Sequence, residues 1–286
     1  MTSRSCIYRN LISAVLFMSI LLMCGSVSAD DNKEVTIRFS LEEGTVLKYK
    51  GSSMMEMNWK GIVLNNMHSD EVEMSWLETL EGEKQRVEVN YIACSDRRSM
   101  GGAAAMDFDS PVKPEGRAVK VVVGADGRPD EAAGFILGIK GGKALKDYVN
   151  KWFFELPEAP VKKGSKWTVI VPREDEKKDE EEESGTEFKG AFDLELKKFE
   201  KKKGIEVAVI KFKAKISIHN ESEQGVLDGE SKSEGEVKVA IEGGYIVEFK
   251  SSSEMKGKLI SQDEFSGKET STDIVQIRSS EIKLQK

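Results

Sequence analysis

Methionine and histidine side chains gather in one short stretch of this sequence, and thioether and imidazole groups are ligands that suit Cu(I). The candidate ligands are Met55, Met57, Met67 and His68. One hypothesis is therefore a soft-metal-binding protein. The alternative is that Met55 and Met57, which alternate in step with Trp59, fill a hydrophobic core, as flexible methionine side chains commonly do.

No motif in the sequence predicts catalysis. The two histidines, His68 and His219, do not have the spacing of a zinc site, and the chain has no G-x-S-x-G segment. Residues 253–256 and 280–283 match S-x-x-K, but they lie in strand-like, serine-rich stretches. Residues 138–143 resemble a phosphate-binding loop whose glycine spacing is one residue short. We therefore expect a protein that is not an enzyme and has no cofactor.

The first 29 residues have the three parts of a secretory signal peptide: Arg4 and Arg9 at the start, an apolar stretch over 11–23, and a small-residue end at Ala29. This stretch of 13 residues spans roughly 20 Å as a helix, which is less than the ~30 Å core of a bilayer. We expect cleavage after Ala29, a secreted or periplasmic protein, and no transmembrane span in the mature chain. The alternative is lipid attachment at Cys24, because the residues around it resemble a bacterial lipobox.

The chain beyond Ala29 is acidic. It holds 41 basic and 50 acidic residues, which argues against nucleic-acid binding, since that binding relies on cationic contacts to phosphate. A run of charged residues at about 173–185 contains no apolar side chain and predicts a flexible loop. Cys94 is the one cysteine left after the signal peptide. No internal disulfide can then form, and a hydrophobic core must stabilise the fold.

Apolar and polar residues alternate through most of the mature sequence, and this period of two predicts half-buried β-strands. Short turns with glycine separate the runs, at residues 60–61, 81–82, 126–127, 203–204 and 243–244. Turns this short join antiparallel neighbours. We predict a mainly β (α+β) domain over residues 30–286, with a large curved antiparallel meander sheet packed on one or two helices. Changes of parity near 209–211 and 278–281 predict β-bulges that bend the sheet.

One segment breaks the period of two. Apolar residues recur three or four positions apart along 143–154, which predicts an amphipathic helix, and residues 130–139 predict a shorter one. The aromatic stripe of the longer helix must be covered, and the open side of the curved sheet can cover it. We expect a hydrophobic cleft there. Its predicted lining residues are Tyr148, Trp152, Phe153 and Phe154.

The block around this helix resembles one found in exported bacterial proteins of unknown function. It combines a strand, the Asp126-Gly127 turn, the helix and an L-P-x-x-P-V-x-x-G-x-x-W sequence. The matching residues are Leu156, Pro157, Pro160, Val161, Gly164 and Trp167. A curved sheet that holds a helix is also similar to the lipoprotein-carrier (LolA-like) architecture. The resemblance implies export and a β fold, and it implies no activity.

Together these features predict an exported, non-enzymatic binding or envelope-associated protein. We expect it to hold a hydrophobic ligand or a protein segment, or to contact another envelope protein; the sequence does not give the identity of this partner. The alternative hypothesis is a Cu(I)-binding protein that uses the methionine-rich strand region.

Overall fold

In a computed structural model of the chain, the described residues are 33–107, 112–139, 142–172, 186–222, 225–262 and 269–285. The chain divides into two compact units, Met1–Lys33 and Glu34–Lys286, and the fold below is that of the second unit. The predicted signal peptide, Cys24 and the charged run at 173–185 lie outside the described residues. Within the described ranges, no helix is long and apolar enough to cross a membrane.

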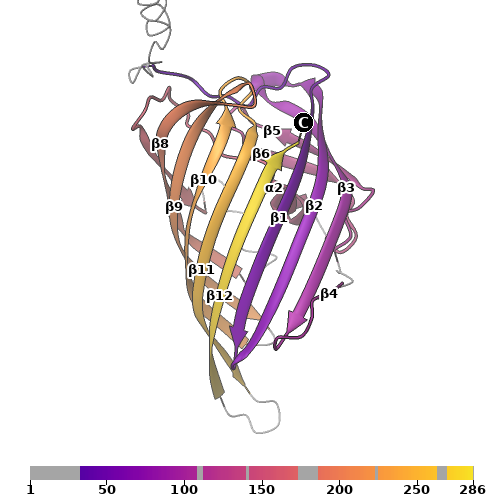
Figure 1. Ribbon diagram of the computed structural model, residues 1–286, viewed down its shortest axis with the longest axis vertical. Coiled ribbons are helices and arrows are strands. Elements are labelled where there is room, and N and C mark those ends of the chain that lie inside the picture. Colours follow the sequence, from indigo (N-terminus) through magenta and orange to yellow (C-terminus); the bar gives the residue numbers. More distant parts are fainter. Residues whose placement is uncertain are drawn as a thin grey trace, which may run out of the picture. The chain divides into compact units, whose positions relative to one another are not determined.

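The second unit is built on one antiparallel sheet of 12 strands, which confirms the predicted fold class (Figure 1). The strands are β1 (Val46–Trp59), β2 (Ile62–Thr79), β3 (Gln85–Met100), β4 (Met106–Asp107), β5 (Ala118–Val123), β6 (Pro129–Gly134), β7 (Lys166–Val171), β8 (Thr186–Lys202), β9 (Ile205–Ser222), β10 (Gly225–Ala240), β11 (Ile246–Gln262) and β12 (Glu269–Leu284). A short 3-10 helix, η1 (Glu81–Glu83), and helix α2 (Gly142–Asn150) accompany them. The order in the sheet is β6-β5-β3-β2-β1-β12-β11-β10-β9-β8-β7, and β4 pairs with β3.

Two-residue turns join neighbouring strands where the sequence predicts them. Lys60 and Gly61, between β1 and β2, have φ values of 51° and 79°, and Lys203 and Gly204, between β8 and β9, have φ values of 51° and 88°. Two consecutive positive φ angles fit the type I′ turn, whose twist matches that of the strands it joins. These turns fix the register, and therefore which residues of each strand face inward.

The first and last strands, β1 and β12, pair with each other, which leaves β6 and β7 as the outer strands of the sheet. The connection from β6 to β7 must therefore cross from one edge of the sheet to the other. This connection carries α2 and passes over the concave face, where the Trp152 ring lies against Gly51 at the middle of β1. The topology thus places the aromatic segment on the inner side of the sheet.

The hydrophobic core lies between this crossing segment and the inward side chains of the strands. Tyr49, Val72 and Tyr91 from the sheet are at most 2 % exposed, and so is Trp152 from the crossing segment. Each such side chain contributes roughly 1.5–3 kcal/mol by its burial. Ile37, from the chain before β1, closes the core and is fully buried.

The predicted second helix at 130–139 is wrong. Residues 129–134 form β6, which pairs with β5 across the Asp126-Gly127 turn. The hairpin supplies hydrogen-bond partners for the backbone N–H and C=O groups of this segment. The turn and the pairing that it permits therefore outweigh the helical spacing of the apolar residues. Helix α2 is also shorter than predicted, because it ends at Asn150. Trp152 and Phe153 follow it in a turn, in which their N–H groups donate to Val149 and Asn150 at 3.0 Å.

The predicted bulges on β9 and β12 are also wrong. β12 pairs without a register shift with both neighbours, and the irregularity near residues 209–210 lies on the facing strand β8, between Leu196 and Lys198. The parity of the β9 residues changes because both faces of the sheet are covered there. A small outer cluster contains Val207, Val209, Ala240 and Val247. On β12, Ile277 lies on the outer face and is half exposed.

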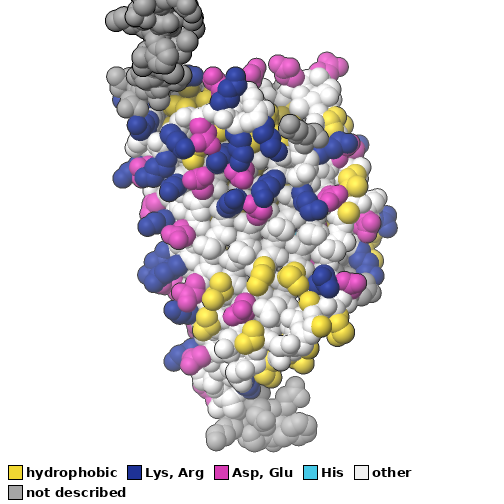
Figure 2. Space-filling model, viewed as in Figure 1, with side chains coloured by type: hydrophobic (Ala, Val, Ile, Leu, Met, Phe, Trp, Pro, Cys, Tyr) yellow, Lys and Arg dark blue, Asp and Glu magenta, His cyan; other side chains and the backbone are white. Residues whose placement is uncertain are grey.

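The outer face of the sheet changes character along the strands (Figure 2). Lysine, arginine and acidic side chains gather over one end, and hydrophobic side chains toward the other. Met54 of β1 and Ile277 of β12 lie close together on the outer face of these two paired strands and are 48 % and 50 % exposed. This outer group is a second apolar surface, separate from the concave side.

Candidate functional site: a hollow between the sheet and the crossing segment

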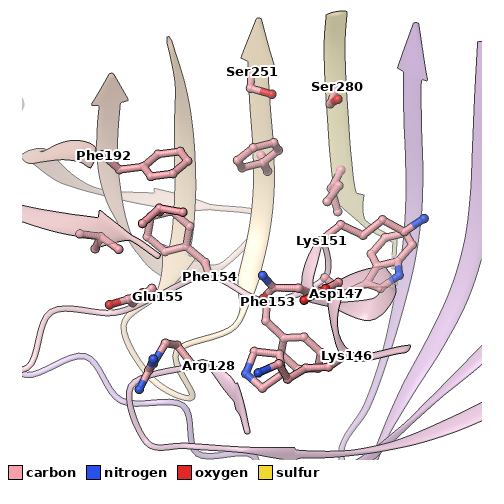
Figure 3. Close-up of a pocket in the computed structure, with 18 of the residues that line it drawn as sticks. Arg128, Lys146, Asp147, Lys151, Phe153, Phe154, Glu155, Phe192, Ser251 and Ser280 are labelled. Atoms are coloured by element: carbon pink, nitrogen blue, oxygen red, sulfur yellow. The ribbon is translucent and has the colours of Figure 1, made fainter. Parts of the chain in front are cut away.

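A cavity of about 1320 Å³ lies on the concave side of the sheet (Figure 3). Its walls come from α2 and the segment after it, from the edge strands β6 and β7, and from the inward faces of β1, β2 and β8–β12. Small-molecule pockets are commonly about 300–1,000 Å³. The hollow can therefore hold a ligand larger than a typical drug-sized molecule.

One side of the cavity is aromatic. The Phe212 ring stacks on Phe249 with centroids 5.7 Å apart and an interplanar angle of 12°, and it lies 6.2 Å from Phe192. Phe192 and Phe249 are only partly buried, as is Phe154 in the crossing segment. Their rings line the open space (Figure 3).

The other side of the cavity is lined by hydroxyl groups. The register places Ser53, Ser280 and Ser251 next to one another on β1, β12 and β11. One row further from α2, Ser253 stands opposite Ser233 of β10. All five serines line the cavity. Because their side chains are small, they leave open the space that larger residues fill closer to α2.

Three of the four predicted cleft residues line the cavity, namely Trp152, Phe153 and Phe154. Tyr148 is not among the lining residues, and its ring packs 5.7 Å from that of Tyr91 in the core. Trp152 is held firmly, because its Nε1–H donates to the Tyr91 hydroxyl at 3.1 Å. A Cβ atom on Gly51 would come within 2.8 Å of the Trp152 ring, so this position requires glycine.

The register separates the predicted Cu(I) ligands. Met55 and Met57 share the inward parity of Ser53 in β1, whereas Met67 of β2 stands opposite Met54 on the outer face. His68 faces inward, and both of its ring nitrogens already contact carboxylates. The four predicted ligands therefore do not converge on one point.

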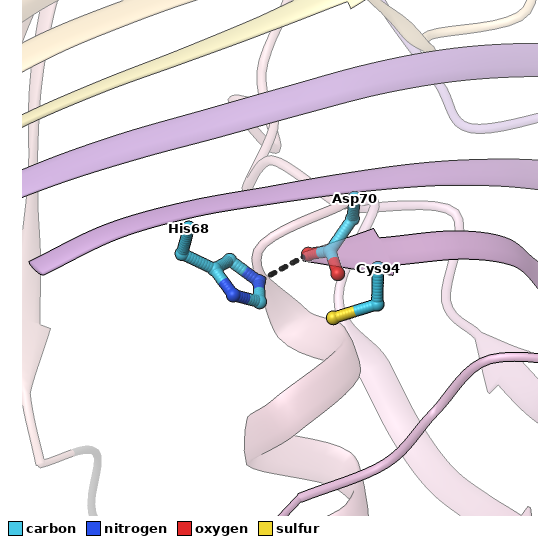
Figure 4. Close-up of side chains that lie close together, drawn as sticks. All are labelled: His68, Asp70 and Cys94. Atoms are coloured by element: carbon cyan, nitrogen blue, oxygen red, sulfur yellow. Dashed lines mark hydrogen bonds and ion pairs between the residues drawn. The ribbon is translucent and has the colours of Figure 1, made fainter. Parts of the chain in front are cut away.

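His68 belongs to a polar cluster at the border of the cavity (Figure 4). Its Nε2 is 2.8 Å from Oδ2 of Asp70, and its Nδ1 is 2.9 Å from Oδ1 of Asp96. Lys151, the first residue after α2, pairs with the same Asp70 oxygen. Asp70 is only 2 % exposed, and the ligand atoms of His68, Asp70 and Cys94 all lie within 4.8 Å of one another.

The charges of this cluster stabilise one another. The hydrogen bond to Asp70 raises the pKa of His68, although burial opposes the change. Burial raises the pKa of Asp70, but the hydrogen bond from His68 and the positive charge of Lys151 outweigh it and hold that pKa below its usual value. Lys151 also lies 4.6 Å from the centre of the Tyr148 ring. The cluster is thus a network of ion pairs that connects β2 to the end of α2.

Cys94 is a weak nucleophile in this setting. Burial, together with the negative charge of Asp70, raises the pKa of its thiol to about 12. At neutral pH the thiol therefore stays protonated, and the thiolate is the reactive form of cysteine.

The inward serines and the Asp70–Lys151 pair were not expected from the sequence. A signal for the serines exists, since Ser251 and Ser253 continue the odd-numbered parity of Phe249. Ser280 likewise continues the even-numbered parity of Ile282. Inward serines in long strands indicate a face that is not packed against a core.

No family model and no curated protein matches the sequence. Among solved structures, one described as "lipid-protein interactions in lipovitellin" is similar to this chain, with a TM-score of 0.50 and 8 % sequence identity. The similarity covers 86 % of this chain and 26 % of that one, so the chain spans about a quarter of the length of the lipovitellin chain. At this identity the likeness concerns the fold alone.

Proposed function

We propose that this protein is an exported, non-enzymatic binding protein that holds a hydrophobic, lipid-like ligand in the cavity. The observation that carries the proposal is a hollow of about 1320 Å³ bordered by partly buried phenylalanine rings. Protein interiors are normally close-packed. Apolar surface left beside water costs about 25 cal/mol per Å², and an apolar ligand in the hollow removes that cost.

Two further observations support this function. The crossing segment supplies aromatic residues to the cavity from the side opposite the sheet, so a ligand would be enclosed from both sides. The fold is shared with a lipovitellin structure that is described by its lipid–protein interactions. Export rests on the sequence of residues 1–29 and on the resemblance to exported bacterial proteins.

The proposal is tested by placing a large side chain at a position that lines the cavity. Ser251 of β11 faces the hollow, and its neighbour Ser252 lies on the outer face and is exposed. Ser251→Trp and Ser252→Trp therefore add the same ring on opposite sides of one strand. The measurement is the fluorescence of the neutral dye N-phenyl-1-naphthylamine, and its displacement by oleyl alcohol.

The wild type and Ser252→Trp are expected to bind the dye and release it to oleyl alcohol. Ser251→Trp is expected to lose at least nine-tenths of the dye signal while its circular dichroism stays unchanged. Absence of dye binding by the wild type would overturn the proposal. So would undiminished binding by a folded Ser251→Trp variant.

A further inference from the structure

Four adjacent strands of the concave wall carry a single inward charged residue among the described positions. This residue is Arg278 of β12. The inward positions are the odd numbers 47–59 in β1, 227–237 in β10 and 249–261 in β11, and the even numbers 270–284 in β12. On the outer face of the same strands, lysines and glutamates form ion pairs such as Lys250–Glu281 and Lys256–Glu254. A lone cation on the inner face is thus a departure from the pattern of this sheet.

Arg278 has no counter-ion of its own. Its cross-strand neighbours are Met55 in β1 and Ser253 in β11, and in the part of the chain that the structure describes no carboxylate forms an ion pair with it. The acidic residues that border the cavity are engaged elsewhere or lie on the other walls. Asp70 is paired with Lys151, Asp130 with Lys84 and Glu281 with Lys283.

Three more acids border the cavity from the side that faces the sheet. Asp147 belongs to α2, Glu155 to the segment after it, and Glu131 to β6. Three cations border the same side, namely Arg128, Lys146 and Lys151, and Arg128 and Lys151 pair with Asp126 and Asp70. The charges of that side therefore largely offset one another. On the sheet side, the positive charge of Arg278 has no carboxylate opposite it on either neighbouring strand, and it attracts an anion.

The surroundings of Arg278 suit an oxyanion. A guanidinium group presents five N–H donors in a planar fork that matches a carboxylate or a phosphate. Ser253 and Ser280 stand beside Arg278 on the same inner face, and their hydroxyl groups can donate to the remaining oxygens. An anion held there would have both a counter-charge and hydrogen-bond donors.

The aromatic side of the cavity lies on the same row of the sheet. From Arg278 the row runs through Ser253, Ser233 and Ala214 to Phe192 of β8. Four steps between strands at ~4.8 Å each measure roughly 19 Å along the sheet. An elongated molecule with a charged end and an apolar tail can therefore contact both sides at once.

We propose that the cavity binds an anionic amphiphile, with its carboxylate or phosphate headgroup on Arg278 and its apolar tail against Phe192, Phe212 and Phe249. This inference rests on the proposed function and adds the class of ligand and its orientation.

The test compares two ligands that differ in their headgroup, oleate and oleyl alcohol, as competitors of N-phenyl-1-naphthylamine at pH 8. The variant is Arg278→Gln. The matched control is Lys256→Gln, which removes a cation from the outer face of the neighbouring strand β11. Acetate and inorganic phosphate are tested alone, to separate binding of the headgroup from binding of a free anion.

The wild type and Lys256→Gln are expected to bind oleate about tenfold more tightly than oleyl alcohol, which corresponds to one hydrogen-bonded charge contact. Arg278→Gln is expected to lose this preference and to bind oleyl alcohol within twofold of the wild type. Equal affinities for the two ligands in the wild type would overturn the inference, as would an unchanged preference in Arg278→Gln. Displacement of the dye by acetate or phosphate alone would also overturn it.

The two proposals fail in different ways. If neither oleate nor oleyl alcohol displaces the dye from the wild type, the proposed function itself is wrong. If both displace it equally and Arg278→Gln behaves in the same way, hydrophobic binding stands and only the anionic headgroup is wrong.

Discussion

Strands β1, β11 and β12 pass through two different environments along one inward face. Close to the crossing segment, their inward residues include Tyr49 and Ile282, which are 2 % and 7 % exposed in the core. One or two inward positions further along stand Ser53, Ser251 and Ser280, which line the hollow. The alternation of side chains is the same in both places. What differs is their size and polarity, which decide whether an inward face becomes core or cavity.

The largest change in stability is expected when the side chain of Trp152, in the packed region, is removed. Trp152→Ala should lower the free energy of unfolding by about 3–5 kcal/mol, the usual cost of a buried aromatic side chain, because Trp152 fills the space over Gly51 and bonds to Tyr91. Phe154→Ala truncates a half-buried residue that lines the cavity. It should lower the free energy of unfolding by clearly less. The measurement is urea denaturation. Equal losses for the two variants would contradict a difference between the two regions.

A smaller change in stability is expected when a valine is introduced into the packed region and, separately, into the cavity. Gly51→Val should destabilise the protein by about 1–3 kcal/mol, as overpacking does, since its Cβ would meet the Trp152 ring at 2.8 Å. Ser280→Val should change stability by less than about 1 kcal/mol, because the added methyl group enters the hollow. Comparable melting temperatures for both variants would show that the region around Trp152 is not tightly packed.

The smallest change in stability is expected from the network of ion pairs around His68, beside the cavity. The pKa of His68 is raised in the folded protein from its ordinary 6.5. Its contribution to stability is therefore complete below about pH 6.5 and is lost as the pH rises through the folded-state pKa. The groups that face it are Asp70, Asp96, Lys151 and Cys94. The difference in melting temperature between the wild type and His68→Gln should shrink over this range, and a difference that grows with pH would have the wrong sign.

The sequence predicts the elements of this fold better than the hollow they enclose. Alternation and glycine turns identify the strands, because both depend on neighbouring residues. The row that joins Ser53, Ser280 and Ser251 depends on the pairing of β1 with β12, whose partners lie more than 200 positions apart in the chain. No local pattern contains that pairing.

Parity alone could have corrected one prediction. Met67 and His68 are consecutive residues of a strand, so their side chains point to opposite faces. They could not both join Met55 in one metal site. The 130–139 helix is wrong for another reason. The Asp126-Gly127 turn, which the sequence also predicts, pairs residues 129–134 with β5, and this pairing outweighs the helical spacing of the apolar residues.

The most direct test of the central claim is to locate a bound lipid on the protein. A fatty acid with a photoreactive diazirine in its chain is cross-linked to the full protein, and the modified residues are mapped by mass spectrometry after proteolysis. The account predicts cross-links to the inward residues Phe192, Phe212 and Phe249. Cross-links confined to the outer apolar group around Met54 and Ile277 would contradict it, because the lipid would then bind outside the hollow.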